Sequence, residues 1–165
     1  MAGTDTTIHG IGSAVWLLAS NPEAWAALRD GPGLARPAWE EALRLESPVS
    51  FFARGVTRDT EFGGVSLEKG DRVVMLFGSA NRDESHYPRA DRFEIDRAPT
   101  DHVAFGYGVH GCAGQGLARI EGVAILTTLA RRVERIEIAG PPTRHLNNTV
   151  YGLESLPVRL HPAGS

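Results

Sequence analysis

Residues 105–114 read Phe-Gly-Tyr-Gly-Val-His-Gly-Cys-Ala-Gly and lead into a predicted helix at 113–132. They contain Cys112, the only cysteine of the 165-residue chain. A thiol at a helix N-terminus meets unpaired backbone N–H groups and the positive end of the helix dipole, and both favour the thiolate. The surrounding glycines permit tight turns and the close approach of a flat ligand. A single thiolate on such a loop suits an axial position on a haem iron.

Cys112 by itself also fits a small buried apolar side chain, and a glycine-rich turn before a helix also fits a phosphate site. The full pattern, Phe-Gly-x-Gly-x-His-x-Cys-x-Gly, is more specific. It resembles the haem-ligand loop of the cytochrome P-450 family in its bacterial form. The resemblance implies that Cys112 is the axial ligand of the iron of haem b. It also implies that Phe105 and Gly106 line the cofactor, and that the N–H groups of Ala113 and Gly114 donate to the thiolate.

Composition and charge favour some classes over others. A net charge of −3 with 22% charged residues indicates no nucleic-acid partner. One cysteine excludes an internal disulfide and fits a reducing compartment, so we expect a cytoplasmic location. The apolar runs are shorter than a membrane span, and the polar residues after Met1 do not fit a signal peptide. We therefore expect no membrane association.

The pattern of apolar residues predicts a mainly α chain with small β-sheets, an α+β class, forming one partial domain over 1–165. Helices are predicted at 2–20, 22–30, 37–45 and 113–132, with Asn21 as an N-cap before Pro22. Strands are predicted at 52–58, 60–62, 65–67, 72–77, 134–138, 144–147 and 157–160. Gly63-Gly64 indicates a hairpin turn, and 78–100 indicate a loop with at most one helical turn.

Residues 2–7, Ala-Gly-Thr-Asp-Thr-Thr, place an acid and alcohols at the start of the first predicted helix. Threonine and aspartate commonly cap helices. The stretch also resembles the centre of the P-450 family's long oxygen-activating helix, which crosses the distal face of the haem. The resemblance implies that Ala2 and Gly3 keep this face open for O2. It implies that Asp5 and Thr6 are catalytic and deliver protons through water.

Glu41 and Arg44 lie three residues apart, on one face of a predicted helix. Such pairs on a surface contribute less than ~1 kcal/mol. This pair resembles the family's Glu-x-x-Arg, which lies behind the haem. The resemblance implies a buried structural network of Glu41, Arg44 and Arg92 that holds the loop before Cys112. Arg89 is a less suitable third member than Arg92.

Haem propionates need cations. The resemblance assigns this role to Arg54, on a predicted strand, and to His110, although Arg54 also fits a solvated strand residue. The other histidines show no metal-ligand spacing and receive no role: His9, His86, His102, His145 and His161.

The resemblance also indicates a substrate pocket and a reaction. The pocket-lining positions are mostly apolar, which favours a small or aromatic substrate: Val49, Ser50, Phe51, Val150 and Tyr151. Residues 147–157 resemble those of bacterial members that act on para-substituted aromatic acids. We expect a monooxygenase that inserts one oxygen atom of O2 into a small organic substrate. Electrons come from NAD(P)H through a ferredoxin-type partner and its reductase.

The resemblance covers the whole chain but only the C-terminal part of the family's fold. Met1 falls inside the oxygen-activating helix, where a natural domain does not begin. We therefore expect a C-terminal fragment that is inactive by itself. The alternatives are a haem-binding or vestigial protein without monooxygenase activity and, third, a haem-free structural domain.

Overall fold

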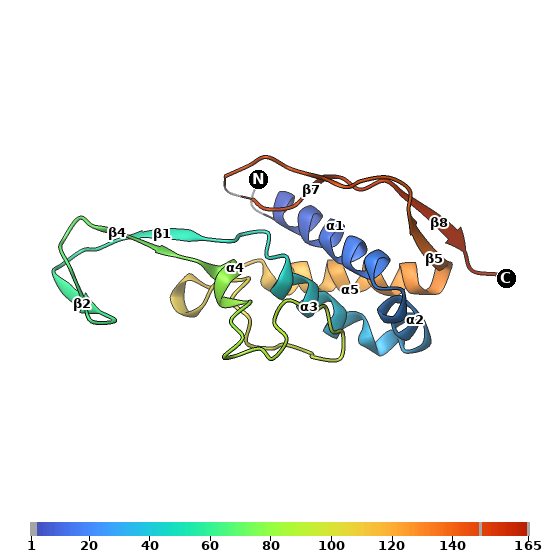
Figure 1. The fold of residues 1–165 in the computed structure, drawn as a ribbon, viewed down its shortest axis with the longest axis horizontal. Coiled ribbons are helices and arrows are strands. Elements are labelled where there is room, and N and C mark those ends of the chain that lie inside the picture. Colours follow the sequence, from blue (N-terminus) through green and yellow to red (C-terminus); the bar gives the residue numbers. More distant parts are fainter. Residues whose placement is uncertain (1–2, 149, 165) are drawn as a thin grey trace.

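The structure, a computed structural model, describes residues 3–148 and 150–164. Its helices form one body (Figure 1). They are α1 (Asp5–Ser20), α2 (Pro22–Asp30), the 3-10 turn η1 (Pro32–Leu34), α3 (Ala35–Leu45), α4 (Phe77–Ala80), the 3-10 turn η2 (Gly108–His110) and α5 (Gln115–Arg132). Small antiparallel sheets surround this body, so the expected class of mainly α with small sheets is confirmed.

Each sheet within the described ranges is a pair of antiparallel strands. The pairs are β1 (Phe52–Gly55) with β4 (Arg72–Met75), β2 (Thr60–Phe62) with β3 (Val65–Leu67), β5 (Val133–Ile138) with β8 (Val158–Pro162), and β6 (Thr143–Arg144) with β7 (Leu153–Ser155). The sheet β5–β8 continues directly from α5 and packs against α1 and α2. No helix in these ranges is long and apolar enough to cross a membrane.

The core lies where α3 packs against both α1 and α5. Trp39 of α3 is 1% exposed and lies between a glycine of each neighbouring helix. A Cβ atom on Gly122 of α5 would lie 2.3 Å from the indole ring, and one on Gly10 of α1 would lie 3.0 Å from it. Only glycine permits so close a helix–helix approach, so these two positions determine the spacing of the body.

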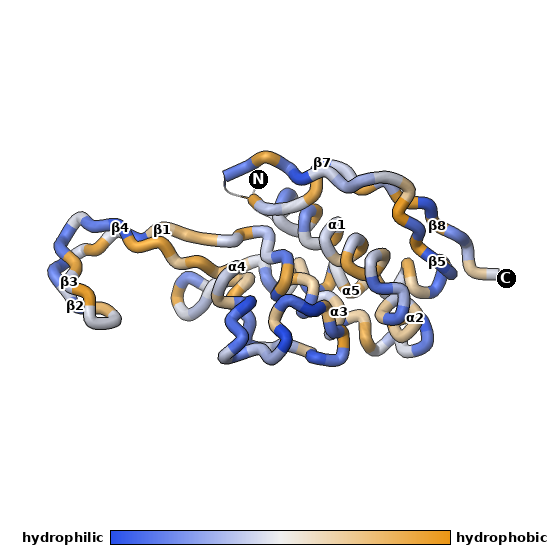
Figure 2. The backbone as a smooth tube through the Cα atoms, viewed as in Figure 1, coloured by the Kyte–Doolittle hydropathy of each residue, from blue (hydrophilic) through white to orange (hydrophobic). Residues whose placement is uncertain are grey.

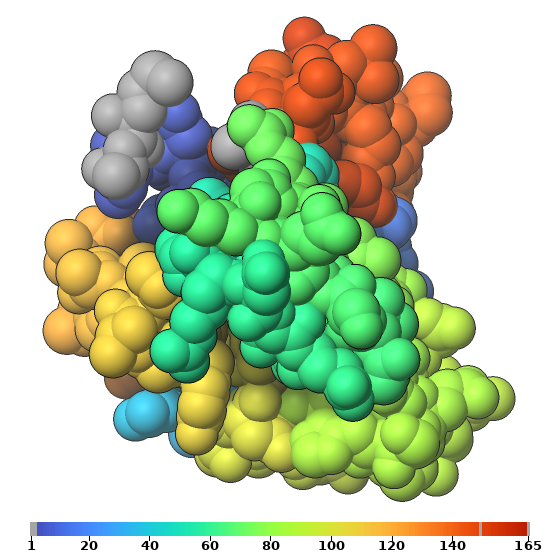
Figure 3. All heavy atoms as spheres, turned by 90° about the vertical axis from the view of Figure 1, so that its left-hand side faces the viewer, coloured from blue at the N-terminus to red at the C-terminus, as the bar shows by residue number. Residues whose placement is uncertain are grey.

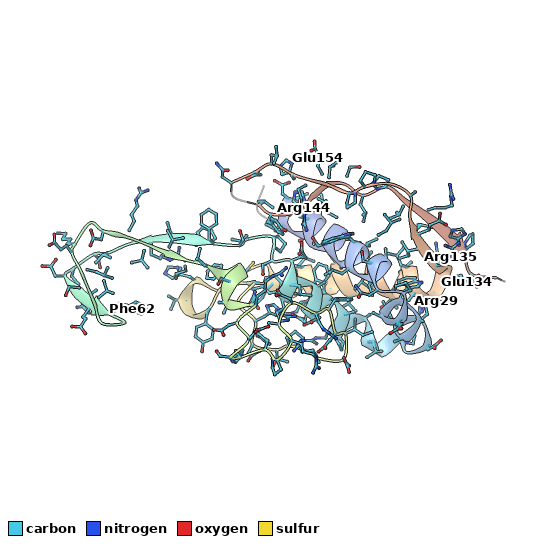
Figure 4. All side chains as sticks on the ribbon, viewed as in Figure 1. Arg29, Phe62, Glu134, Arg135, Arg144 and Glu154 are labelled. Carbon is cyan, nitrogen blue, oxygen red and sulfur yellow. The ribbon has the colours of Figure 1, made fainter. Side chains whose placement is uncertain are left out.

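Residues 52–75, here called the arm, extend away from the helical body (Figure 1). Gly63 and Gly64 both have positive φ, which confirms the predicted hairpin turn between β2 and β3. Apolar positions continue along β1 and β4 outside the body (Figure 2). Phe62 lies near the far end of the arm and is 72% exposed (Figure 4).

Several element boundaries differ from the prediction. Helix α1 begins at Asp5 rather than residue 2, because Gly3 has a φ of +93° and lies in a turn. The side chain of Asn21 does not cap α2; it donates to the carbonyl of Leu17 instead. Helix α3 begins at Ala35, with Pro37 in its first turn, where a missing N–H costs nothing.

Helix α5 begins at Gln115, two residues later than predicted. Strands β1 and β4 are shorter than predicted, and β4 stops before Phe77, which opens α4. Strand β6 ends at Arg144, where 144–147 was predicted, and β7 was not predicted. Strands β6 and β7 contain only two and three residues and lack the tight Gly-Gly turn that identifies the equally short β2 and β3, which have their predicted bounds.

Candidate functional site

The loop that carries Cys112 is closed by its own backbone. The N–H of Cys112 donates to the carbonyl of Phe105 at 2.8 Å, and Gly106 and Gly108 turn the chain between them with φ of +72° and +63°. Cys112 is exposed. None of the hydrogen bonds among the described residues uses the N–H of Ala113 or of the next residue, Gly114. These donors precede α5 and are available to a thiolate, as expected for a helix N-terminus.

The first turn of α1, the arm and the Cys112 loop lie at the same end of the molecule. Figure 3 shows this end, with α1 in blue, the arm in teal and green, and the loop in yellow. Asp5 and Thr6 are half-buried in the first turn of α1. Gly3 is exposed, and a Cβ there would meet nothing within 4 Å. Ala2 lies outside the described residues.

Two cations were predicted to bind propionates. Arg54 is half-buried on β1, where its Nη1 donates to the carbonyl of Ala53 and its guanidinium lies 5.3 Å from the ring centre of Phe52. His110 is exposed at the end of η2. Within residues 3–148 and 150–164 neither side chain forms a salt bridge, so both remain available to an anionic ligand.

These residues fit a haem. The donor set is a single exposed thiol beside unused backbone N–H groups, as one axial thiolate requires. The nearest atom to a Cβ on Gly114 would be Cys112 Sγ, at 3.9 Å, so the backbone leaves the sulfur accessible. Tyr107 and Val109 of the same loop are 88% and 97% exposed and offer apolar surface to a flat ligand.

The Glu41–Arg44 pair is fully buried, as predicted, with both side chains 0% exposed. Arg44 Nε and Nη2 donate to the two Glu41 carboxylate oxygens at 2.7 and 2.8 Å. Arg44 Nη1 donates to the carbonyls of Asn81 and Ala90, so the pair holds the long loop that follows α4. Such a charged pair is tolerated in a core because every donor and acceptor has a partner.

The predicted third member of this network is wrong. Arg97 donates through Nε to Glu41 Oε1 at 3.1 Å, and only the backbone carbonyl of Arg92 contacts Arg44. The Arg92 side chain is exposed. Arg89, the less suitable candidate, pairs with Glu94. Arg92 and Arg97 each come directly after an aspartate, so the local sequence did not distinguish them.

The structure contains a second buried ionic cluster, centred on Glu40, that was not predicted from the sequence. Glu40 accepts hydrogen bonds from His102 Nε2 at 3.0 Å and from Arg119 Nε at 2.6 Å. Burial raises the pKa of Glu40, but the hydrogen bonds from His102 and Arg119 outweigh it and lower this pKa below its ordinary value of 4.5. These partners are 62 and 79 residues from Glu40 in the chain, and no local pattern connects them.

The segments predicted to line a substrate pocket lie together. The N–H of Tyr151 donates to the carbonyl of Pro48 at 2.7 Å, which joins residues 150–151 to residues 49–51. Gly152 packs directly on the ring of His9, so this segment also contacts α1. The Arg144 guanidinium lies 4.5 Å from the ring centre of Tyr151 and 4.7 Å from that of Trp16 on α1, and so strengthens the contact.

A cavity of about 650 Å³ lies elsewhere, lined by Trp16, Glu46, Arg82, Asp91 and Phe93 among others. Its lining includes none of the predicted pocket residues. Arg82 forms salt bridges with Glu46 and Asp91 across it. This charged lining does not suit the small apolar substrate predicted from sequence.

Similarity to known proteins covers nearly the whole chain. The family model described as cytochrome P450 matches residues 35–153. Cytochrome P450 CYP199A2 of Rhodopseudomonas palustris is 53% identical over 162 residues, which are 98% of this chain and 39% of that protein. Linalool 8-monooxygenase of Pseudomonas putida is 38% identical over 98% of this chain and 40% of its own length. The chain therefore spans about 40% of the length of the curated relatives it matches.

Solved structures give the same result. CYP108D1 of Novosphingobium aromaticivorans superposes with a TM-score of 0.94 at 36% identity, over 98% of this chain and 39% of that one. P450BioI, solved in complex with an acyl carrier protein bearing hexadec-9Z-enoic acid, superposes with a TM-score of 0.93 at 38% identity, over 97% of this chain and 42% of that one. The small sheets and the arm are thus part of a known fold.

Proposed function

The chain belongs to the cytochrome P450 family, and we propose that it is the thiolate-haem part of a monooxygenase. The reaction inserts one oxygen atom of O2 into a small organic substrate. The observation that carries the proposal is the exposed Cys112 thiol on a backbone-closed glycine loop, directly before α5. A haem iron with one thiolate ligand supplies the electron density that favours O–O cleavage.

Each residue of the site has a proposed role in binding haem b. Cys112 ligates the iron, and the N–H groups of Ala113 and Gly114 donate to its sulfur and so lower the electron density there. Phe105 shields the sulfur from water. Arg54 and His110 donate hydrogen bonds to the propionates, since neither has a salt-bridge partner within the described ranges.

On α1, Asp5 and Thr6 are proposed to hold and relay protons through water. Both are half-buried in the first helical turn, so their carboxylate and hydroxyl are near solvent but not fully surrounded by it. In the active enzyme, Thr6→Ala is expected to separate electron consumption from product formation, and Thr6→Ser to restore the coupling. Unchanged coupling in Thr6→Ala would remove Thr6 from the relay.

The proposed haem site is tested by adding haem to the purified chain and recording the carbon monoxide difference spectrum after reduction. We expect the absorption maximum typical of a thiolate-ligated ferrous haem, and its loss in Cys112→Ala. His86→Ala is a control, because His86 is an exposed residue paired with Asp101 and belongs to no proposed haem contact. A wild-type chain that takes up no haem would refute the proposal.

A haem-binding protein without turnover is the second candidate. The observation that favours it is the exposure of the Cys112 loop, since Cys112, Tyr107 and Val109 are all open to water. Substrate-dependent NAD(P)H consumption that yields a hydroxylated product supports the monooxygenase. A thiolate-type spectrum without such turnover supports the second candidate.

The proposed substrate is small and apolar or aromatic. The contact of Tyr151 with Pro48 brings mostly apolar segments together at one place. Shifts of the haem absorption on adding 4-methoxybenzoate or terpenes test this class, and linalool is included because one relative is named linalool 8-monooxygenase. The proposed electron source is NAD(P)H through a ferredoxin-type partner and its reductase. The proposed location is the cytoplasm, where a lone thiol stays reduced.

A further inference from the structure

The cluster of Glu40, His102 and Arg119 lies behind the Cys112 loop and has no role in the site described above. Glu40 and His102 are buried, with side chains 9% and 2% exposed. Arg119 extends from α5, the helix that follows Cys112, and pairs with Glu40 at 2.6 Å. Arg36 also approaches Glu40, but only at 4.0 Å and from an exposed position. The cluster thus joins α3, α5 and the segment before Phe105.

The hydrogen bonds assign the tautomer of His102. Its Nδ1 accepts a hydrogen bond from the N–H of Ala104 at 3.2 Å, so this nitrogen carries no proton. The proton is on Nε2, which donates it to Glu40. A neutral ring therefore connects the Glu40 carboxylate to the backbone one residue before Phe105. This connection holds the turn that enters the loop.

Arg119 makes a second connection to the same loop. Its guanidinium lies 4.6 Å from the ring centre of Phe105, and its Nη1 donates to Gln115 Oε1 at 2.8 Å. Gln115 is the first residue of α5, and its N–H donates to the carbonyl of Cys112 at 3.3 Å. The N–H of Cys112 in turn donates to the carbonyl of Phe105. Arg119 therefore contacts the residues that hold the cysteine backbone on both sides.

From these contacts we infer that Glu40, His102 and Arg119 are positioning residues for the Cys112 thiolate. His102 and Arg119 orient Phe105, and Arg119 also orients the first turn of α5. Glu40 holds the side chains of His102 and Arg119 in place. The Cys112 backbone is bonded to Phe105 and Gln115, so the cluster determines where the sulfur lies. The inference rests on the proposed haem-thiolate function and extends it to residues that do not touch the haem.

Two substitutions of His102 separate its two hydrogen bonds. In His102→Asn the amide oxygen replaces Nδ1 and still accepts from Ala104, but the contact with Glu40 is lost. In His102→Gln the amide nitrogen replaces Nε2 and still donates to Glu40, but the acceptor for Ala104 is lost. His102→Ala loses both bonds. The matched control is His86→Ala, which removes an exposed histidine–carboxylate pair that has no contact with Phe105.

The measurement is the rate at which the reduced carbon monoxide complex of the haem-loaded protein changes from the thiolate-type spectrum to that of a protonated or displaced thiol. We expect His102→Ala to raise this rate by roughly tenfold or more, since it removes a buried hydrogen bond to a charged group. His102→Asn and His102→Gln give intermediate rates, and His86→Ala gives the wild-type rate. Unchanged rates in the His102 variants overturn the inference.

The reduction potential gives a readout that a purely structural role does not predict. In Glu40→Gln the cation of Arg119 loses its carboxylate while it stays stacked on Phe105. An uncompensated positive charge near the thiolate favours the reduced iron, so the potential is expected to rise. His102→Gln keeps the Glu40–Arg119 pair and is expected to leave the potential unchanged. Equal reduction potentials in Glu40→Gln and wild type would contradict an electrostatic effect of the cluster on the haem.

The outcomes separate this inference from the proposed function. A wild-type chain without a thiolate-type spectrum refutes the proposed function, and the inference fails with it. A normal wild-type spectrum with variants that behave like His86→Ala refutes the inference alone. If His102→Ala does not fold, the rates of His102→Asn and His102→Gln decide. Variants that lower only the unfolding stability of the haem-free chain, with spectra unchanged, show that the cluster is structural and overturn the inference.

Discussion

Replacing Arg97 with alanine is expected to destabilise the chain much more than replacing Arg92, although sequence favoured Arg92. The Arg97 side chain is 11% exposed and donates four hydrogen bonds: to the carboxylates of Glu41 and Glu94 and to the carbonyls of Pro88 and Arg89. Arg97→Ala removes all four. Arg92 is exposed, and its hydrogen bonds to described residues use only its backbone carbonyl and N–H, which alanine retains.

The expected loss of unfolding free energy depends on the contacts that Glu41 keeps in Arg97→Ala. Removing one partner of a buried ion pair costs about 3–5 kcal/mol when the other charge is left alone. Glu41 keeps its bidentate contact with Arg44 and its bond from the N–H of Glu94, so the expected cost of Arg97→Ala is lower, about 2–4 kcal/mol. Arg92→Ala is expected to change stability by no more than about 0.5 kcal/mol.

Urea unfolding followed by tryptophan fluorescence measures the difference, because Trp25 and Trp39 are buried. With a slope of about 2 kcal/mol per molar urea, the midpoint of Arg97→Ala falls by about 1–2 M. Arg92→Ala removes the same charge, so it controls for net charge. Arg97→Lys keeps the charge but lacks the planar guanidinium, so its unfolding midpoint is expected to lie between those of Arg97→Ala and Arg92→Ala. An equal or larger loss in Arg92→Ala would refute the assignment of Arg97.

The remaining predictions concern packing and acid. Gly122→Ala is expected to lower the unfolding free energy by about 1–2 kcal/mol in urea unfolding, because its Cβ overlaps the Trp39 ring and the overpacking exceeds the helix-propensity gain. Gly12→Ala, where a Cβ meets nothing within 4 Å, is expected to be neutral or stabilising, and similar behaviour of the two variants would contradict this packing. The lowered pKa of Glu40 means that its contribution to stability is present above pH 4.5 and is lost as the pH falls below that value. The gap in unfolding free energy between wild type and Glu40→Gln should therefore narrow on acidification; a gap independent of pH would contradict the pairing of Glu40.

The long helices could be predicted from sequence because their apolar patterns are long. Strands β2 and β3 were also predicted with their observed bounds, because Gly63-Gly64 identifies the turn between them. The predicted start of helix α5 was within two residues of the observed start, and both predicted ends of α2 match the structure. Strand β7, with three residues, was missed. Gly3 shows a further limit, since a glycine within a helical motif takes a left-handed conformation in the structure and the helix begins after it.

Sequence alone determined the chemistry that is local in the chain: the Cys112 loop, and the Glu41–Arg44 pair on one helix face. In both cases the spacing along the backbone fixes which groups meet, because a helix turn or a tight loop brings neighbours together. Only the tertiary structure decided that Arg97 reaches Glu41, and that His102 and Arg119 converge on Glu40 behind Phe105. These partners are far apart in sequence, and they meet because buried charges must be paired once α3 packs against α5 and the long loop closes over them.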